Sequence, residues 1–170
     1  MVMTTKHKHV VFLSGPIGVG KTTVGRALAS RLEGGFIDGD DHSDPDKPWY
    51  SSIRRTSASI VETGVRLLAS RAFVVVAYPL GRMTWIYYRR KFGDLGVGTL
   101  FVTLRAPYET IVSPTRGREF SVAEHDRIKV MIAEGYSDRP FSDLIVDADQ
   151  APLPETADLL ATEVRRLVAG

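Results

Sequence analysis

Short apolar runs alternate with longer amphipathic segments along this chain. The runs are rich in β-branched and aromatic residues and lie at positions 10–13, 36–37, 73–77, 99–104 and 144–146. Between them, apolar residues recur at spacings of three and four over positions 21–32, 52–70, 84–92, 108–112, 122–134 and 155–168. The runs predict strands and the amphipathic segments predict helices. Their alternation predicts an α/β fold with a mostly parallel sheet.

Length and composition favour one domain. The chain has 170 residues, of which 44% are hydrophobic, and this is enough for one core. We therefore expect a single domain over residues 1–170, with a flexible N-terminus over about residues 1–8. The apolar run at 10–13 is too short for a signal-peptide core or a membrane span, and the chain has no cysteine. We expect a cytoplasmic protein.

The charge is nearly balanced, with a formal net charge of +2 and no long basic run. A chain of this kind gives no indication of a nucleic-acid or membrane partner. We expect a small-molecule partner and a monomer or a homodimer.

The segment "GPIGVGKT", residues 15–22, follows the first predicted strand and opens the first predicted helix. It matches the phosphate-binding pattern G-x-x-x-x-G-K-[ST], in which glycines allow backbone N–H groups to surround phosphate oxygens. Lysine at the seventh position reaches the β- and γ-phosphates, and the following threonine ligates Mg²⁺. The pattern predicts an ATP and Mg²⁺ site. Its residues are Gly15, Pro16, Gly18, Val19, Gly20, Lys21, Thr22 and Thr23.

Two features separate this chain from other proteins with a phosphate loop. It has no N-K-x-D or T-K-x-D stretch, so a GTPase is disfavoured. The third predicted strand ends in Tyr78 and Pro79, where an ATPase motor carries an acidic residue. The acids follow the second strand instead, in "FIDGDDH", where alternation points Asp38 and Asp40 to the same side.

With these acids, the chain resembles the shikimate kinase and gluconate kinase group of small P-loop kinases over nearly its whole length. The resemblance implies a three-layer P-loop fold with a five-stranded parallel sheet in the order 2-3-1-4-5 and a short lid. It also implies that Asp38 supports Mg²⁺ and that Asp40 holds the acceptor hydroxyl and accepts its proton. The alternative is that these acids are solvated or cap a helix.

The segment "SPTRGREFS" resembles the lid of these kinases, at about residues 114–121. The resemblance implies that Arg116 stacks on adenine and that Arg118 moves onto the transferring phosphates. The roles of the two arginines are interchangeable at this stage, and each could be a solvated charge. The segment "VDADQAPLPETADLL" resembles the adenine loop, with Pro154 as the first residue of the last helix.

The resemblance also implies an acceptor site for an anion. Arg139, in "YSDRPFSD", and Arg54 or Arg55, early in the second predicted helix, match arginines that bind the substrate carboxylate in shikimate kinases. An ion pair of Arg139 with Asp138 or Asp143 is the alternative. The family's glycine triplet after the third strand is replaced here by "AYPLG", so Tyr78, with Trp49 and Tyr50 of a substrate loop at about residues 41–52, would make the pocket more aromatic.

These observations favour an ATP-dependent kinase of a small, hydroxylated and anionic metabolite. Lys21, Asp40 and Arg118 are the expected catalytic residues. A nucleoside or nucleotide kinase is the nearest enzymatic alternative. An ATP-binding regulatory module that transfers nothing is the alternative from another class.

Overall fold

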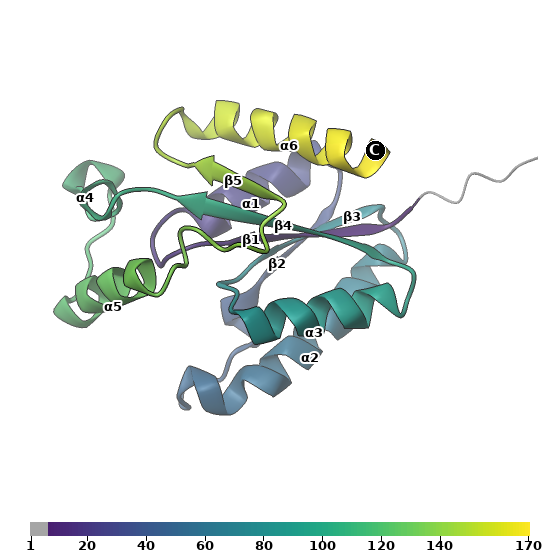
Figure 1. Ribbon diagram of the computed structural model, residues 1–170, viewed down its shortest axis with the longest axis horizontal. Helices are drawn as coiled ribbons and strands as arrows, with labels where there is room; N and C mark the ends of the chain where they lie inside the picture. Colours follow the sequence, from purple (N-terminus) through teal and green to yellow (C-terminus); the bar gives the residue numbers. More distant parts are fainter. Residues whose placement is uncertain (1–6) are drawn as a thin grey trace, which may run out of the picture.

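The structure, a computed structural model, describes residues 7–170, with the side chain of Trp49 excepted. Its strands are β1 His9–Ser14, β2 Gly35–Asp38, β3 Phe73–Ala77, β4 Gly98–Arg105 and β5 Leu144–Asp147. They form one parallel sheet in the order β2-β3-β1-β4-β5 (Figure 1). The predicted strands, the α/β class and the strand order are confirmed. The N-terminal segment expected to be flexible lies, for residues 1–6, outside the described residues.

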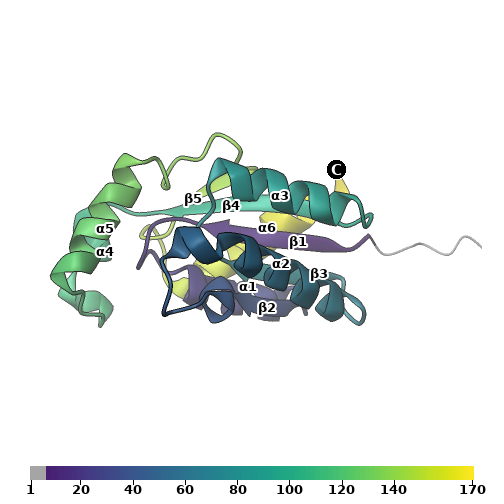
Figure 2. The ribbon, with the colours of Figure 1, turned by 90° about the horizontal axis from the view of Figure 1, so that it is seen from below.

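The helices are α1 Lys21–Arg31, α2 Trp49–Leu68, α3 Arg82–Gly93, α4 Tyr108–Ile111, α5 Val122–Ala133 and α6 Leu153–Ala169, with 3-10 turns η1 Gly39–His42 and η2 Pro114–Arg116. Helices α1 and α6 cover one face of the sheet, and α2 and α3 cover the other (Figure 2). Both faces of the sheet are covered because the side chains of the central strand, β1, alternate between the two faces and are apolar on each. Val11 and Leu13 pack into the α1 and α6 side, whereas Val10 and Phe12 pack into the α2 and α3 side.

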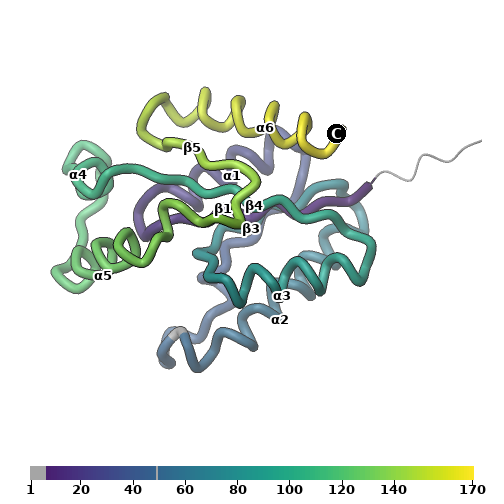
Figure 3. Tube along the Cα trace, viewed as in Figure 1, coloured from purple at the N-terminus to yellow at the C-terminus, as the bar shows by residue number. Residues whose placement is uncertain are grey.

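Helices α4 and α5 lie beyond the carboxyl end of the sheet. The Cα trace leaves the end of β4, passes through both helices and returns to β5 (Figure 3). The loops after β1, β2 and β3 open at the same end. In an open parallel sheet this edge is where ligands bind, so α5 covers the part of the fold in which a site is expected.

Two of the boundaries that differ from the sequence prediction concern expected site residues. Helix α2 begins at Trp49 rather than at residue 52, with Pro48 as its N-cap, so the range expected as a substrate loop contains the end of η1 and the first turn of α2. Helix α6 begins at Leu153, so Pro154 is its second residue rather than its first. A proline is tolerated throughout a first helical turn because those N–H groups have no partner within the helix.

Candidate active site

The loop between β1 and α1 has the backbone that its glycines permit. Gly20 caps α1 with a left-handed φ of 108°, which places it where a side chain would be strained. Gly15 has a φ of 147°, and a Cβ there would lie 2.4 Å from the carbonyl oxygen of Leu104. The loop therefore packs against the end of β4 with no room for a side chain.

Lys21 is the first residue of α1 and points its ammonium group into the loop. Its Nζ donates hydrogen bonds to the carbonyl oxygens of Gly15 at 2.9 Å and Pro16 at 2.7 Å. Burial lowers the pKa of Lys21 to about 8, although the carboxylates of Asp40 and Asp38 act in the opposite direction. Its partners are carbonyls, so a phosphate would be its first anionic ligand within bonding reach.

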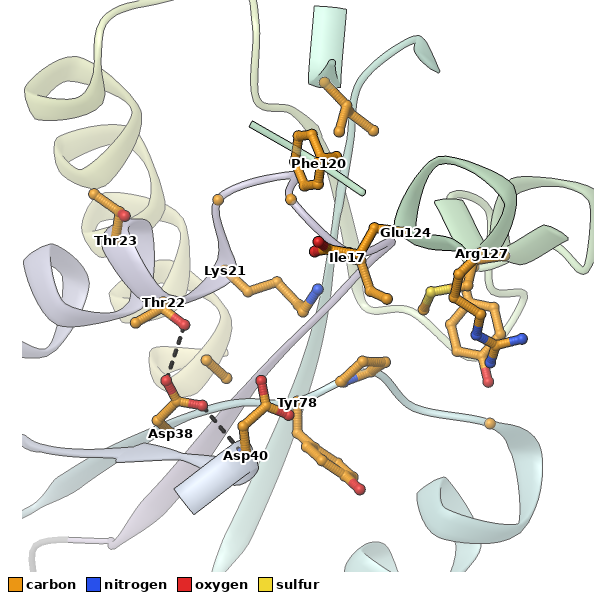
Figure 4. Close-up of a pocket in the computed structure, with 18 of the residues that line it drawn as sticks. Ile17, Lys21, Thr22, Thr23, Asp38, Asp40, Tyr78, Phe120, Glu124 and Arg127 are labelled. Carbon is orange, nitrogen blue, oxygen red and sulfur yellow. Dashed lines mark hydrogen bonds between the residues drawn. The ribbon is translucent and has the colours of Figure 1, made fainter. Parts of the chain in front are cut away.

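The acidic pair lies on the opposite wall. Thr22 Oγ1 donates to Asp38 Oδ2 at 3.1 Å, and Asp38 Oδ1 accepts from the backbone N–H of Asp40 at 3.1 Å. Asp38 ends β2 and Asp40 stands in η1, and both side chains face the cavity that Lys21 enters (Figure 4). Partial burial raises the pKa of Asp40, the charge of Asp38 adds to the rise, and the ammonium of Lys21 opposes it. Both acids line one cavity, but strand alternation is not the cause, because β2 ends at Asp38 and Asp40 lies in η1, which the side chain of Asp38 caps.

Tyr78 holds this acidic turn in place from β3. Its ring packs on Gly39, where a Cβ would lie only 2.2 Å from Tyr78 Cδ2. The Tyr78 side chain is 8% exposed, and burial, followed by the charge of Asp40, raises its pKa. The tyrosine lines the cavity that Asp40 also lines, and its predicted contact with a substrate stays a prediction.

The lid lies on the phosphate loop. An N–H of the Arg116 guanidinium donates to the carbonyl oxygen of Val19 at 3.2 Å. Arg118 donates to Glu124 at 3.0 Å and lies over the ring of Phe120, 4.6 Å from its centroid. The Phe120 ring covers Gly18, where a Cβ would meet it at 2.6 Å. Both arginines therefore face the cavity in this structure.

These groups line one cavity of about 890 Å³, large enough for two small substrates. Its predicted lining residues are Gly18, Gly20, Lys21, Thr22, Thr23, Asp38, Asp40, Tyr78, Arg116 and Arg118. Its further lining residues include Ile53, Arg82, Met83, Phe120, Glu124, Arg127, Met131 and Tyr136. Three further predicted residues belong to the loop: Gly15, Pro16 and Val19. Lys21 donates to the carbonyl oxygens of Gly15 and Pro16, and Arg116 donates to that of Val19.

Other predicted site residues lie outside the lining. Arg54 and Arg55 are exposed on α2. Pro154 is exposed at the start of α6. Tyr50, with 67% of its surface exposed, does not line the cavity either, and the side chain of Trp49 lies outside the described residues.

The side chain of Arg139 links two segments of the chain. Its Nε donates to the carbonyl oxygen of Leu80 at 3.0 Å, and its Nη1 donates to that of Glu134 at 3.1 Å. Its guanidinium lies over the ring of Tyr136, 3.9 Å from the centroid. It thus joins the loop after β3 to the end of α5. The considered ion pairs with Asp138 or Asp143 are not among its contacts in the described residues, and Asp143 accepts from the backbone N–H of Phe101 instead.

Sequence reasoning missed the cavity residues on α5. Glu124, Arg127 and Met131 are spaced three and four residues apart, so they share one helix face. The S-x-x-E pattern from Ser121 to Glu124 was a readable signal for the start of α5. It could not show that this helix turns the same face toward the cavity. Arg82 directly follows the loop after β3, so the rule that ligands bind at the carboxyl edge could have indicated it.

Within the described residues, no cluster of three or more His, Asp or Glu side chains could hold a metal by itself. A divalent cation at Thr22 and Asp38 would need oxygen ligands from phosphate and water, which is how Mg²⁺ is commonly held beside phosphates. No helix in this part of the chain is long and apolar enough to cross a membrane.

Comparisons with known proteins agree with this geometry. No protein-family model matches the chain. A stretch of 74 residues is 40% identical to shikimate kinase 2 of Escherichia fergusonii, and it covers 41% of this chain and 37% of that relative. The chain thus aligns with little more than a third of the length of this curated relative.

Solved structures match over nearly the full chain. A gluconokinase from Sinorhizobium meliloti has a TM-score of 0.70 at 24% identity, covering 95% of this chain and 93% of its own. A shikimate kinase from Acinetobacter baumannii in complex with shikimate has a TM-score of 0.65 at 19% identity, covering 94% of each chain. The fold is that of these P-loop kinases, and the resemblance inferred from the sequence is confirmed.

Proposed function

We propose that this protein transfers the γ-phosphoryl group of ATP to a hydroxyl group of a small, anionic metabolite. One observation carries the proposal: the ammonium of Lys21, the Thr22–Asp38 pair and the carboxylate of Asp40 face the same cavity. A phosphate-binding loop alone would serve any nucleotide-binding protein. A second carboxylate opposite the loop adds what a transferase needs, a group that can hold an acceptor.

The residues of the loop suit the phosphates of ATP. The buried ammonium of Lys21 is bound only by carbonyls among the described residues and would gain an anionic partner. The N-terminus of α1 adds its partial positive charge. Thr22 and Asp38 would hold Mg²⁺, which when bound supplies neutralisation of the phosphate charge. Arg116 would stack on adenine, and Pro154 would border it from the start of α6.

Asp40 would orient the acceptor and accept its proton. As the acceptor oxygen forms a bond to the γ-phosphorus, the bond from that phosphorus to the β-phosphate bridging oxygen breaks and ADP leaves, while the hydroxyl proton passes to Asp40. The raised pKa of Asp40 makes its carboxylate a better base near neutral pH than an exposed aspartate. Arg118 would leave Glu124 and stabilise the charge spread over the transferring group.

Names of similar proteins support the acceptor class. The curated relative is a shikimate kinase, and structural neighbours are a gluconokinase and a shikimate kinase. Shikimate, which is bound in the Acinetobacter baumannii structure, is a hydroxylated acid. We propose that this protein acts in the cytoplasm as a monomer or a homodimer. Its lack of cysteine agrees with a reducing compartment.

The test is ADP formation from Mg·ATP with a panel of hydroxylated acids, polyols and nucleosides, measured against a sample without acceptor. We expect at least one hydroxylated acid to stimulate turnover. Lys21→Ala should remove that turnover while the melting temperature changes little, because the charge of Lys21 is needed mainly when the phosphoryl group is transferred. Stimulation only by nucleosides, or wild-type turnover in Lys21→Ala, would contradict the proposal.

A further inference from the structure

Two arginines of the cavity lining have no partner among the residues that the structure describes. Arg82 begins α3 and Arg127 lies on α5, and both line the cavity. Within the part of the chain that the structure describes, neither makes a hydrogen bond, an ion pair or a ring contact. The other cations of the lining are engaged: Lys21 and Arg116 donate to loop carbonyls, and Arg118 pairs with a carboxylate. Two guanidiniums are therefore free to receive a ligand.

Arg127 lies away from the metal end of the site. Figure 4 shows it across the cavity from Thr22, with Lys21 and Asp40 between them. It is half-buried, so its five N–H donors are only partly hydrated. A partly desolvated guanidinium without an acceptor is unfavourable, and an oxyanion would relieve the cost by forming parallel, charge-assisted hydrogen bonds.

Aromatic and apolar side chains form part of the lining of this cavity, together with Glu124 one turn before Arg127 on α5. Tyr78, Tyr136, Ile53 and Met83 line the same cavity. A molecule bound here would place an apolar face on these side chains, a hydroxyl group at Asp40 and a negatively charged group at the arginines. This combination describes a hydroxylated acid more closely than it describes a nucleoside or a neutral sugar.

The arginines expected from the family resemblance are less suited to this task. The Nε and Nη1 donors of Arg139 are bound to backbone carbonyls, and its face lies on Tyr136. Arg54 and Arg55 are exposed and do not line the cavity. The cavity-lining arginines without a partner in the described part of the chain lie on α3 and α5 instead.

We infer that Arg127, assisted by Arg82, binds a carboxylate or another oxyanion of the acceptor and sets the preference of the site for acids. The inference rests on the proposed function, because it assigns the acceptor end of that same site. Arg127 is a specificity-determining residue here, and the transfer of the phosphoryl group falls to other residues.

The experiment compares acids with neutral molecules of similar shape: shikimate with methyl shikimate, and gluconate with glucitol. In the wild type, the acid should be the better acceptor of each pair. In Arg127→Gln, the KM for the acid should rise about 10- to 100-fold, the loss expected for hydrogen bonds to a charged group. The KM for ATP and for the neutral molecule should change less than about twofold, because neither contact involves the lost charge.

Matched variants separate this role from a structural one. Arg54→Gln removes an arginine that does not line the cavity and should leave the preference intact. Arg127→Lys keeps a positive charge and should restore part of the preference, and Arg82→Gln should weaken it less than Arg127→Gln. An unchanged KM for the acid in Arg127→Gln, or equal losses for the acid and the neutral molecule, would overturn the inference.

Failure of the inference can be told apart from failure of the proposed function. Turnover with neutral acceptors alone would keep the kinase and overturn the role of Arg127. If no acceptor supports turnover, the proposed function fails, and calorimetry with shikimate and gluconate on the ADP-bound protein decides the inference separately. Binding that is lost in Arg127→Gln and kept in Arg54→Gln would support it. Equal binding by both variants, or no binding to the wild type, would overturn it.

Discussion

The ammonium group of Lys21 is buried, and its hydrogen-bond partners are two neutral carbonyl groups. Its Nζ is held by the carbonyls of Gly15 and Pro16, and burial lowers its pKa to about 8. In the free protein, a rise in pH through this value therefore removes the charge that phosphate binding needs. Phosphates bound beside the ammonium would raise its pKa again, because opposite charges favour the ionised form.

This coupling predicts that ATP binding takes up a proton when the pH is above about 8. The affinity for Mg·ATP should fall as the pH rises from about 7.5 to about 9.5, by up to about tenfold per unit above the pKa. Titration calorimetry in two buffers of different ionisation enthalpy would measure both the affinity and the proton uptake. In Lys21→Ala, both effects should vanish. A pH-independent affinity in the wild type would show that Lys21 is already fully charged or does not contact the phosphates.

The carboxylate of Glu124 joins the lid to the start of α5. Glu124 caps the helix by accepting the backbone N–H of Ser121 at 3.2 Å, and it accepts a hydrogen bond from Arg118 at 3.0 Å. These two interactions lower the pKa of Glu124, the first more than the second. Arg118 must leave this partner before it can contact a phosphate. If Arg118 acts on the phosphates as proposed, the start of α5 competes with ATP for it.

Glu124→Gln should weaken this competition without breaking the helix cap, because glutamine also fits the third position of a capping box. An exposed ion pair contributes about 0.2–1 kcal/mol, so the KM for ATP should fall by up to about fivefold. Steady-state kinetics at low salt would measure the change. Glu119→Gln, which alters an exposed lid acid, is the control and should leave the KM unchanged. A KM for ATP that is the same in Glu124→Gln and in the wild type would show that Glu124 does not compete with ATP for Arg118.

The elements also show what the sequence could and could not predict. The phosphate loop and the Asp38–Asp40 pair were predictable because each is fixed by a few adjacent residues at the end of a strand. The arginines that line the cavity from α3 and α5 were not, because a residue on a helix reaches a site only if the helix turns the right face toward it. Arg54 and Arg127 are each the sixth residue of their helix, yet only Arg127 lines the cavity. The rotation of α2 and α5 depends on tertiary packing, which spacing along the chain does not encode.

At the scale of the whole molecule, the sheet brings together segments that are far apart in the sequence. Strands β1, β2 and β3 deliver the loop, the acidic turn and Tyr78 to one edge, and the connection from β4 to β5 adds the lid and α5. Arg139 connects these two groups of segments, because its side chain donates hydrogen bonds both to the loop after β3 and to the end of α5. The residues proposed to bind the nucleotide and those proposed to bind the acceptor therefore line one cavity, as a direct transfer between two substrates requires.

Phosphotransfer and nucleotide binding, compared in Asp40→Asn, show directly whether Asp40 serves the acceptor. This change keeps the size of the side chain but removes the charge and the capacity to accept a proton. We predict that acceptor-dependent turnover falls about 10²- to 10⁴-fold, while the affinity for Mg·ATP changes less than about threefold because Thr22, Asp38 and the loop still hold the phosphates. Both quantities would be measured on the same purified variant. Acceptor-dependent turnover equal to that of the wild type, or a loss confined to nucleotide affinity, would contradict the account.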